Sequence, residues 1–166
     1  MAASPYAAAP PEKLAEIIRE AEALLEAQLS LAAGADQRAL TFAGLLVAAV
    51  GALIGAASAT SSSGLPAGGI LVVSTILFVA ACLALWSARP TPWGTVGNEP
   101  SSWVDDIAEG ADSLHEGMAA MAGYYDAKIS ANYLQIERAA KAMKCSMILT
   151  VTSMTGALVW LGSRLS

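Results

Sequence analysis

Three long stretches of uncharged, mostly apolar residues dominate the pattern of the chain. They cover about residues 39–60, 67–86 and 145–161, and the third is the shortest and most polar. Each approaches the roughly 20 residues that a helix needs to cross about 30 Å of hydrocarbon. The alternative, buried helices of a soluble bundle, is disfavoured because the first two uncharged runs adjoin each other with only Ser61–Pro66 between them. The pattern therefore predicts three transmembrane helices.

Amphipathic stretches lead into the first and third spans. Apolar residues recur there at steps of three and four, the spacing of one helix face. No proline lies between Glu12 and Pro66, so the first helix is predicted to begin near Glu12 and to run on into span one. The apolar positions that we assign to a partner-binding stripe are Leu14, Ile17, Leu24, Met118, Met121, Tyr125 and Ile129.

The predicted fold class is all-α and integral to the membrane, with long cytoplasmic helical extensions of spans one and three that lie side by side as a parallel stalk. The domains are residues 1–38 (N-terminal cytoplasmic helix), 39–86 (transmembrane hairpin), 87–144 (cytoplasmic linker, short helix and long helix) and 145–166 (third span and outer tail). Capping boxes at Ser102–Asp105 and Ser113–Glu116 mark the starts of the short and the long helix. We expect the short helix to end near Gly110 and to pack on the stalk through Trp103 and Ile107.

Orientation follows from the basic residues, which favour the cytoplasmic side. They occur before span one and between spans two and three, but not in Ser61–Pro66. Arg38 and Lys144 stand where spans one and three begin, and Trp86 and Trp160 are expected to anchor opposite membrane faces. We predict a cytoplasmic N-terminus and a periplasmic C-terminus in a bacterial inner membrane. Residues 1–11 lack a secretory-signal pattern, so the first span is expected to direct insertion.

The spans contain two faces of small residues that we assign to helix packing. Span one carries Gly44, Ala48, Gly51 and Gly55, and span three carries Ser146, Thr150, Ser153 and Ala157. Small faces let helices approach closely in lipid. An Ala/Gly-rich composition also produces such faces by chance, and real ones serve packing within one chain as well as oligomerisation.

Composition excludes several classes of function. Only 14% of residues are charged, where soluble domains have roughly 25%. The net charge of −5 leaves no basic surface for nucleic acid. His115 is the one histidine, and Ala119 stands where a zinc-protease motif needs a second. The acidic residues Asp105, Asp106, Glu109, Asp112 and Glu116 form a local cluster that could attract a divalent cation, but no glycine-bearing calcium loop surrounds them, so a solvated helix face is favoured. We therefore predict no enzyme, catalytic residue, cofactor or metal site.

The remaining chemistry is sparse. Cys82 and Cys145 lie inside apolar runs, which disfavours a disulfide framework. The spans contain no ionisable side chain of the kind that pumps and transporters keep in the hydrocarbon.

A resemblance to known proteins is carried by Ala35-Asp-Gln-Arg-Ala39 before span one, Gly97-Asn-Glu-Pro-Ser-Ser-Trp103 after span two, and the run Asn132–Lys144. The chain from about Leu24 onward resembles, in outline, small bacterial three-span membrane proteins, including the membrane effectors of cyclic-pyrimidine antiphage defence (Pycsar effectors). The resemblance implies membrane disruption triggered by a nucleotide signal. The sequence contains no recognisable nucleotide-binding module.

The function that these patterns favour is a non-enzymatic membrane scaffold or accessory subunit of a larger assembly. Its expected partners are the lipid bilayer and other membrane proteins or copies of itself. The alternatives are an antiphage-type effector and a small oligomeric channel lined by the hydroxyls of span three.

Overall fold

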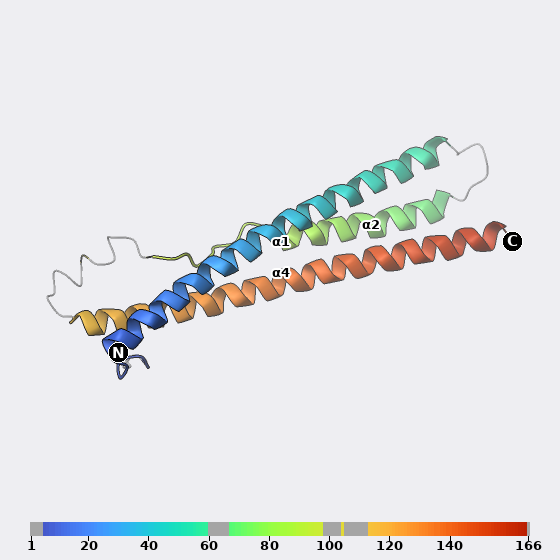
Figure 1. The fold of residues 1–166 in the computed structure, drawn as a ribbon. Helices are drawn as coiled ribbons and strands as arrows, with labels where there is room; N and C mark the ends of the chain where they lie inside the picture. The colour runs from blue at the N-terminus through green and yellow to red at the C-terminus, as the bar shows by residue number, and fades with distance from the viewer. Residues whose placement is uncertain (1–4, 60–66, 98–103, 105–112, 166) are drawn as a thin grey trace. The chain divides into compact units, whose positions relative to one another are not determined.

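The computed structural model describes residues 5–59, 67–97, 104 and 113–165. Its long elements are the helices α1 (Pro11–Ala59), α2 (Ala67–Ser87) and α4 (Leu114–Leu165) (Figure 1). All three are long and apolar enough to cross a membrane. The all-α class and the continuation of both extensions into spans one and three are confirmed. The turn 61–66, the capping box at 102–105 and the short helix after it lie outside the described residues.

Local sequence sets the starts of the two long helices. The Pro10 carbonyl accepts hydrogen bonds from Lys13 N and Leu14 N at 3.0 Å each, which leaves Pro11 in the first turn, where its missing N–H costs nothing. At the start of α4, Ser113 and Glu116 bond each other reciprocally: Ser113 N donates to Glu116 Oε2 at 2.9 Å, and Glu116 N donates to Ser113 Oγ at 3.3 Å. The second predicted capping box is therefore confirmed.

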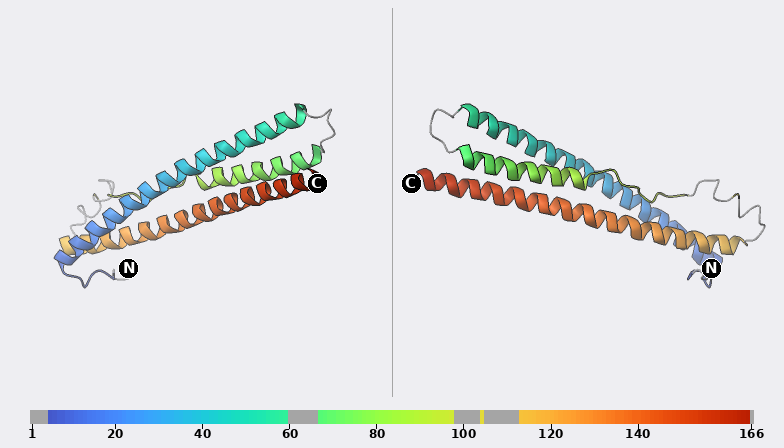
Figure 2. Two further views of the ribbon diagram at one scale, coloured as in Figure 1. Left: turned by 45° about the vertical axis from the view of Figure 1, so that its right-hand side comes forward. Right: turned by 180° about the vertical axis from the view of Figure 1, so that it is seen from behind.

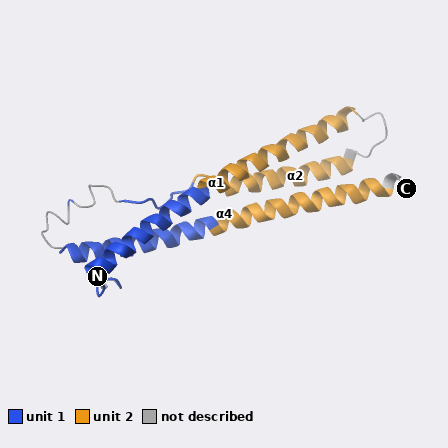
Figure 3. Cartoon of the chain, viewed as in Figure 1, with its two compact units in different colours: residues 1–32, 91–136 blue, residues 33–90, 137–166 orange. Residues whose placement is uncertain are grey.

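The chain divides into two compact units, each built from separate stretches of sequence (Figure 3). Unit 1 comprises residues 1–32 and 91–136. In it, Leu14 of α1 packs with Ala119 and Ala122 of α4, and further along both helices Gln28 Nε2 donates to Ile129 O at 3.3 Å. Because the residue numbers of the contacting positions increase together along α1 and α4, the two helices are parallel in unit 1, as predicted for the two extensions.

Unit 2 comprises residues 33–90 and 137–166, and α2 lies beside both α1 and α4 within it (Figure 2). A cluster of Leu46, Leu77, Ala80 and Ala81 joins α1 to α2, and Leu149 of α4 packs against it. Ser146 Oγ of α4 donates to Ala80 O at 2.6 Å. The buried alanines of α2 permit this close approach in an environment where packing, rather than hydrophobicity, holds helices together.

Candidate functional site

The densest polar site among the described residues is a clamp in unit 1 that holds the segment 92–97 against α4. We call the four α4 side chains that form it the backbone clamp: Tyr125, Lys128, Asn132 and Gln135. Their spacing of three, four and three residues places them on one face of the helix. Each of the four bonds a main-chain group of the segment. The site therefore recognises an extended backbone.

Asn132 is the central member of the clamp. Its side chain is fully buried and pairs with both peptide groups of Gly94: Gly94 N donates to Asn132 Oδ1 at 2.9 Å, and Asn132 Nδ2 donates to Gly94 O at 3.0 Å. The backbone of Gly94 lies so close to α4 that an added Cβ would stand 2.8 Å from Lys128 Cβ. Only glycine permits this approach.

Lys128 and Gln135 bond carbonyl groups on either side of Gly94. Lys128 Nζ donates to Thr95 O at 2.7 Å and to Gly97 O at 3.2 Å, and Gln135 Nε2 donates to Pro92 O at 2.8 Å. The ammonium also lies 4.1 Å from the centroid of the Tyr124 ring, within the range of a cation–π interaction. A charged donor thus holds one end of the segment.

Tyr125 connects the segment to α1. Its hydroxyl accepts from Gly97 N at 3.1 Å and donates to Glu22 Oε1 at 2.9 Å. Burial raises the pKa of the Tyr125 phenol, and the Glu22 carboxylate adds to the rise, while the Gly97 bond opposes it. Gly97 has a φ of 83°, a conformation that glycine adopts readily. One hydroxyl therefore joins α1, α4 and the end of the segment.

Sequence reasoning identified Tyr125 only as part of an apolar stripe and missed the other clamp residues. The available signal was the recurrence of Lys128, Asn132 and Gln135 at helical spacing on the face that holds Tyr125. Polar residues at that spacing are also typical of a solvated face, so the pattern alone did not distinguish the two.

Most side chains of the predicted partner-binding stripe are covered by other residues of unit 1. Leu14 and Tyr125 are buried, and Ile17, Met118, Met121 and Ile129 are half-buried. Leu24, at 48% exposure, is the one stripe residue that is largely accessible. Other exposed apolar side chains of unit 1 are Leu31, Val104, Leu114, Tyr124, Tyr133 and Leu134.

The two small-residue faces have different surroundings in unit 2. On α4, Ser146, Thr150 and Ser153 are buried and Ala157 is half-buried. On α1, all four members, Gly44, Ala48, Gly51 and Gly55, are exposed, and a Cβ built on any of the three glycines meets no atom within 4 Å. The α4 face therefore packs within the chain, while the α1 face is uncovered.

Three of the four predicted membrane-interface residues lie at the surface of unit 2. Arg38, Trp86 and Lys144 are exposed, and the guanidinium carbon of Arg89 stands 4.3 Å from the centroid of the Trp86 ring. Trp160 is half-buried, and its ring lies 3.1 Å from the point that a Cβ on Gly69 would occupy. Gly69 thus makes room for the indole.

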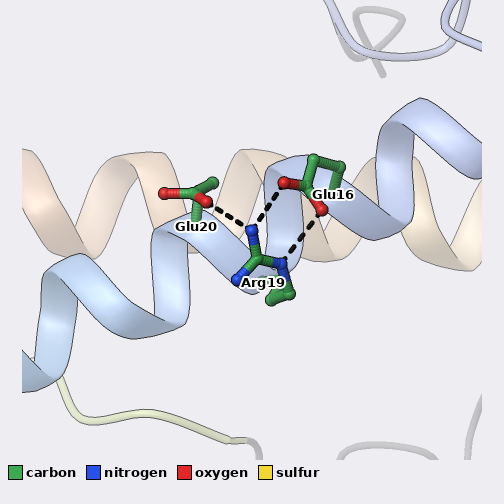
Figure 4. A network of polar contacts seen from close by, with 3 residues as sticks. All are labelled: Glu16, Arg19 and Glu20. Carbon is green, nitrogen blue, oxygen red and sulfur yellow. Dashed lines mark hydrogen bonds and ion pairs between the residues drawn. The ribbon is translucent and has the colours of Figure 1, made fainter.

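An exposed ion-pair network lies on α1 in unit 1, where Arg19 bonds both Glu16 and Glu20 (Figure 4). The hydrogen bond from Arg19 lowers the pKa of the Glu16 carboxyl. Exposed pairs of this kind contribute little to stability. His115, half-buried, bonds Ala9 O through Nε2 at 2.8 Å and thereby holds the segment before α1.

Among the residues that the structure describes, no three His, Cys, Asp or Glu side chains gather as metal ligands. Of the predicted acidic cluster, Asp105, Asp106, Glu109 and Asp112 lie outside those residues. In comparisons with known proteins, the chain matches no family model, no curated protein and no solved structure. The comparisons therefore give no link to the Pycsar effectors, and the likeness to small three-span membrane proteins rests on the three apolar helices.

Proposed function

We propose that the chain is a non-enzymatic membrane scaffold or accessory subunit that associates laterally through the uncovered small-residue face of α1. The observation that carries the proposal is the exposure of Gly44, Ala48, Gly51 and Gly55, with open space around each glycine. At 100° per residue, this face points about 150° away from the buried Leu46 and the half-buried Val50 of the same helix, which pack in the cluster with α2. It is therefore available to another transmembrane helix.

The cover over one hydroxyl face of α4 favours this function over an oligomeric channel. Thr152 and Thr155 are exposed but donate to carbonyl groups of their own helix, whereas Ser146, Thr150 and Ser153 are covered within the chain. A second copy that docks on α1 leaves them covered.

Unit 1 supplies the surface for non-membrane partners in this proposal. The exposed side chains of Leu24 and Leu31 lie on α1, seven residues apart, and Tyr133 and Leu134 lie on α4. Residues seven apart share a helix face. A partner helix that packs along α1 would cover both leucines.

Orientation is part of the proposal: unit 1 faces the cytoplasm and the 61–66 turn faces the periplasm of a bacterial inner membrane. The support is the distribution of basic residues, which occur before span one and between spans two and three but not in residues 61–66. A cysteine placed at Ser62 should react with a membrane-impermeant maleimide on intact spheroplasts, and one placed at Ser30 should react only after lysis. The reverse pattern would overturn the orientation.

Crosslinking tests lateral association. In a background with Cys82→Ala and Cys145→Ala, Ala48→Cys should give an oxidant-induced dimer in native membranes. Val151→Cys is the matched control. Leu46 of α1 and Leu149 of α4 meet in one cluster, so Ala48 and Val151, each two residues further along, lie at nearly the same depth. Val151 is also exposed, at 65%. We expect at least tenfold less dimer from the control. Gly51→Leu should abolish the Ala48→Cys dimer without unfolding the monomer; equal crosslinking of both cysteines would refute the interface.

A further inference from the structure

Charge is divided unevenly between the two units. Unit 2 contains six basic and two acidic residues, a net charge of +4, while unit 1 contains three basic and twelve acidic residues, a net charge of −9. Together these give the −5 of the whole chain. Five of the six basic residues of unit 2 belong to one end of its helices, and we call them the basic collar: Arg38, Arg89, Arg138, Lys141 and Lys144.

Helix register places the three arginines of the collar at one level. In unit 2, Ser146 contacts Ala80, and Leu46 packs in the cluster that contains Ala80. Arg38 precedes Leu46 by eight residues on α1, Arg89 follows Ala80 by nine near the end of α2, and Arg138 precedes Ser146 by eight on α4. Eight residues of helix span about 12 Å. The three arginines therefore lie at a similar distance from that contact.

The two lysines of the collar lie nearer the apolar core. Lys141 and Lys144 follow Arg138 by about one and two turns on α4. Their long side chains can extend along the helix and keep the ammonium at the polar boundary.

The cations of the collar are only partly engaged within the chain. Arg38 Nε donates to Gly34 O at 3.1 Å, and Arg89 Nη1 donates to Trp86 O at 3.4 Å, so each guanidinium keeps most of its five donors. Lys141 forms an exposed pair with Glu137 at 2.7 Å. Arg138 and Lys144 are exposed, and no described residue forms an ion pair with either of them.

We propose that the basic collar binds the headgroups of anionic phospholipids at the boundary of the membrane. Guanidinium groups bind phosphate oxygens through two parallel hydrogen bonds, and three of them stand at a similar level, on α1, on α4 and just past the end of α2. Trp86, which stacks with Arg89, is the kind of amphipathic ring that occurs at headgroup depth. The complementarity is specific to this end of unit 2, because the rest of the chain is strongly acidic. The proposal rests on the three apolar helices spanning a bilayer.

Lipid retention tests the collar. The full chain, reconstituted in nanodiscs of equal parts phosphatidylglycerol and phosphatidylcholine, is extracted in mild detergent, and the retained lipids are quantified by mass spectrometry. We expect a severalfold enrichment of phosphatidylglycerol, weaker at high salt because exposed charges are screened. The triple variant Arg38→Gln, Arg89→Gln, Arg138→Gln should retain the two lipids in their bulk ratio.

The control removes the same number of positive charges elsewhere, through Lys13→Gln, Arg19→Gln and Arg164→Gln, and should keep the enrichment. Replacing the three collar arginines by lysine keeps the charge and loses the paired hydrogen bonds, so an enrichment that is reduced but still above the bulk ratio is expected, and this shows that the glutamine variant did not lose binding through misfolding. The proposal is overturned if wild-type protein shows no enrichment, if the control loses it equally, or if inorganic phosphate at millimolar concentration abolishes it. Loss of the Ala48→Cys dimer with the enrichment intact would instead count against the proposed function alone.

Discussion

Replacing Asn132 by alanine should release the segment 92–97 from α4 while leaving the helix pair of unit 1 folded. The substitution removes two hydrogen bonds, of 2.9 and 3.0 Å, and leaves both peptide groups of Gly94 without their partner. A neutral hydrogen bond contributes about 1 kcal/mol net, and an unsatisfied buried group costs about 1–3 kcal/mol. Gly94 is half-buried, so water can replace part of the lost hydrogen bonding in the variant. We therefore expect the local stability of the segment to fall by about 2–3 kcal/mol.

Hydrogen–deuterium exchange measures this effect directly. A tenfold change in an equilibrium corresponds to about 1.4 kcal/mol, so the amides of the segment should exchange about 30- to 150-fold faster in the variant. Tyr133→Ala is the matched control, because Tyr133 is adjacent on α4, is 64% exposed and has no part in the clamp. Unchanged exchange in the Asn132→Ala variant would refute the account of the clamp. Equal acceleration along all of α4 would show that Asn132 stabilises the helix pair rather than the segment.

The structure fixes the direction of the effect of four further substitutions. Gly94→Ala should loosen the same segment, since its Cβ would stand 2.8 Å from Lys128 Cβ, and faster exchange confined to 92–97 would show it. Ser74→Ala or Ser153→Ala should raise the free energy of unfolding in detergent by up to about 1–2 kcal/mol, because each buried hydroxyl lacks a hydrogen-bond partner; destabilisation would contradict that assignment. The pKa of Glu116 is lowered chiefly by the backbone hydrogen bond from Ser113. The carboxylate therefore stabilises the start of α4 at pH values above its ordinary pKa, and this stabilisation is lost as the pH falls through its lowered pKa. Glu116→Gln should therefore remove the acid-side increase in exchange at the start of α4, and an unaltered pH profile would contradict the assignment.

The helices were predictable because several local signals agree on them. Uncharged runs define the three spans, Pro11 and the Ser113 capping box mark the starts of α1 and α4, and the absence of proline carries both extensions into the spans. These signals depend only on neighbours along the chain. A single sequence therefore contains nearly all the information that they require.

The clamp was not predictable in the same way, because its partner has no periodic pattern. The segment 92–97 contributes peptide groups, which every residue has, so nothing in its side chains except Gly94 indicates the contact. The small-residue faces raised a related difficulty. Glycine, alanine and serine permit close packing wherever a helix arrives, and only the position of α2 decides that the α4 face is covered and the α1 face is not.

Because the clamp binds main-chain groups, the segment 92–97 is far more sensitive to a change in its length than to a change in its amino-acid identities. Residues other than Gly94 and Gly97 can change without disturbing a bond to the four α4 residues, since those bonds end on carbonyl oxygens and amide nitrogens. A single inserted or deleted residue between Pro92 and Gly97 would instead shift every peptide group past its anchor. Related chains would then be expected to keep the number of residues here while varying their identity.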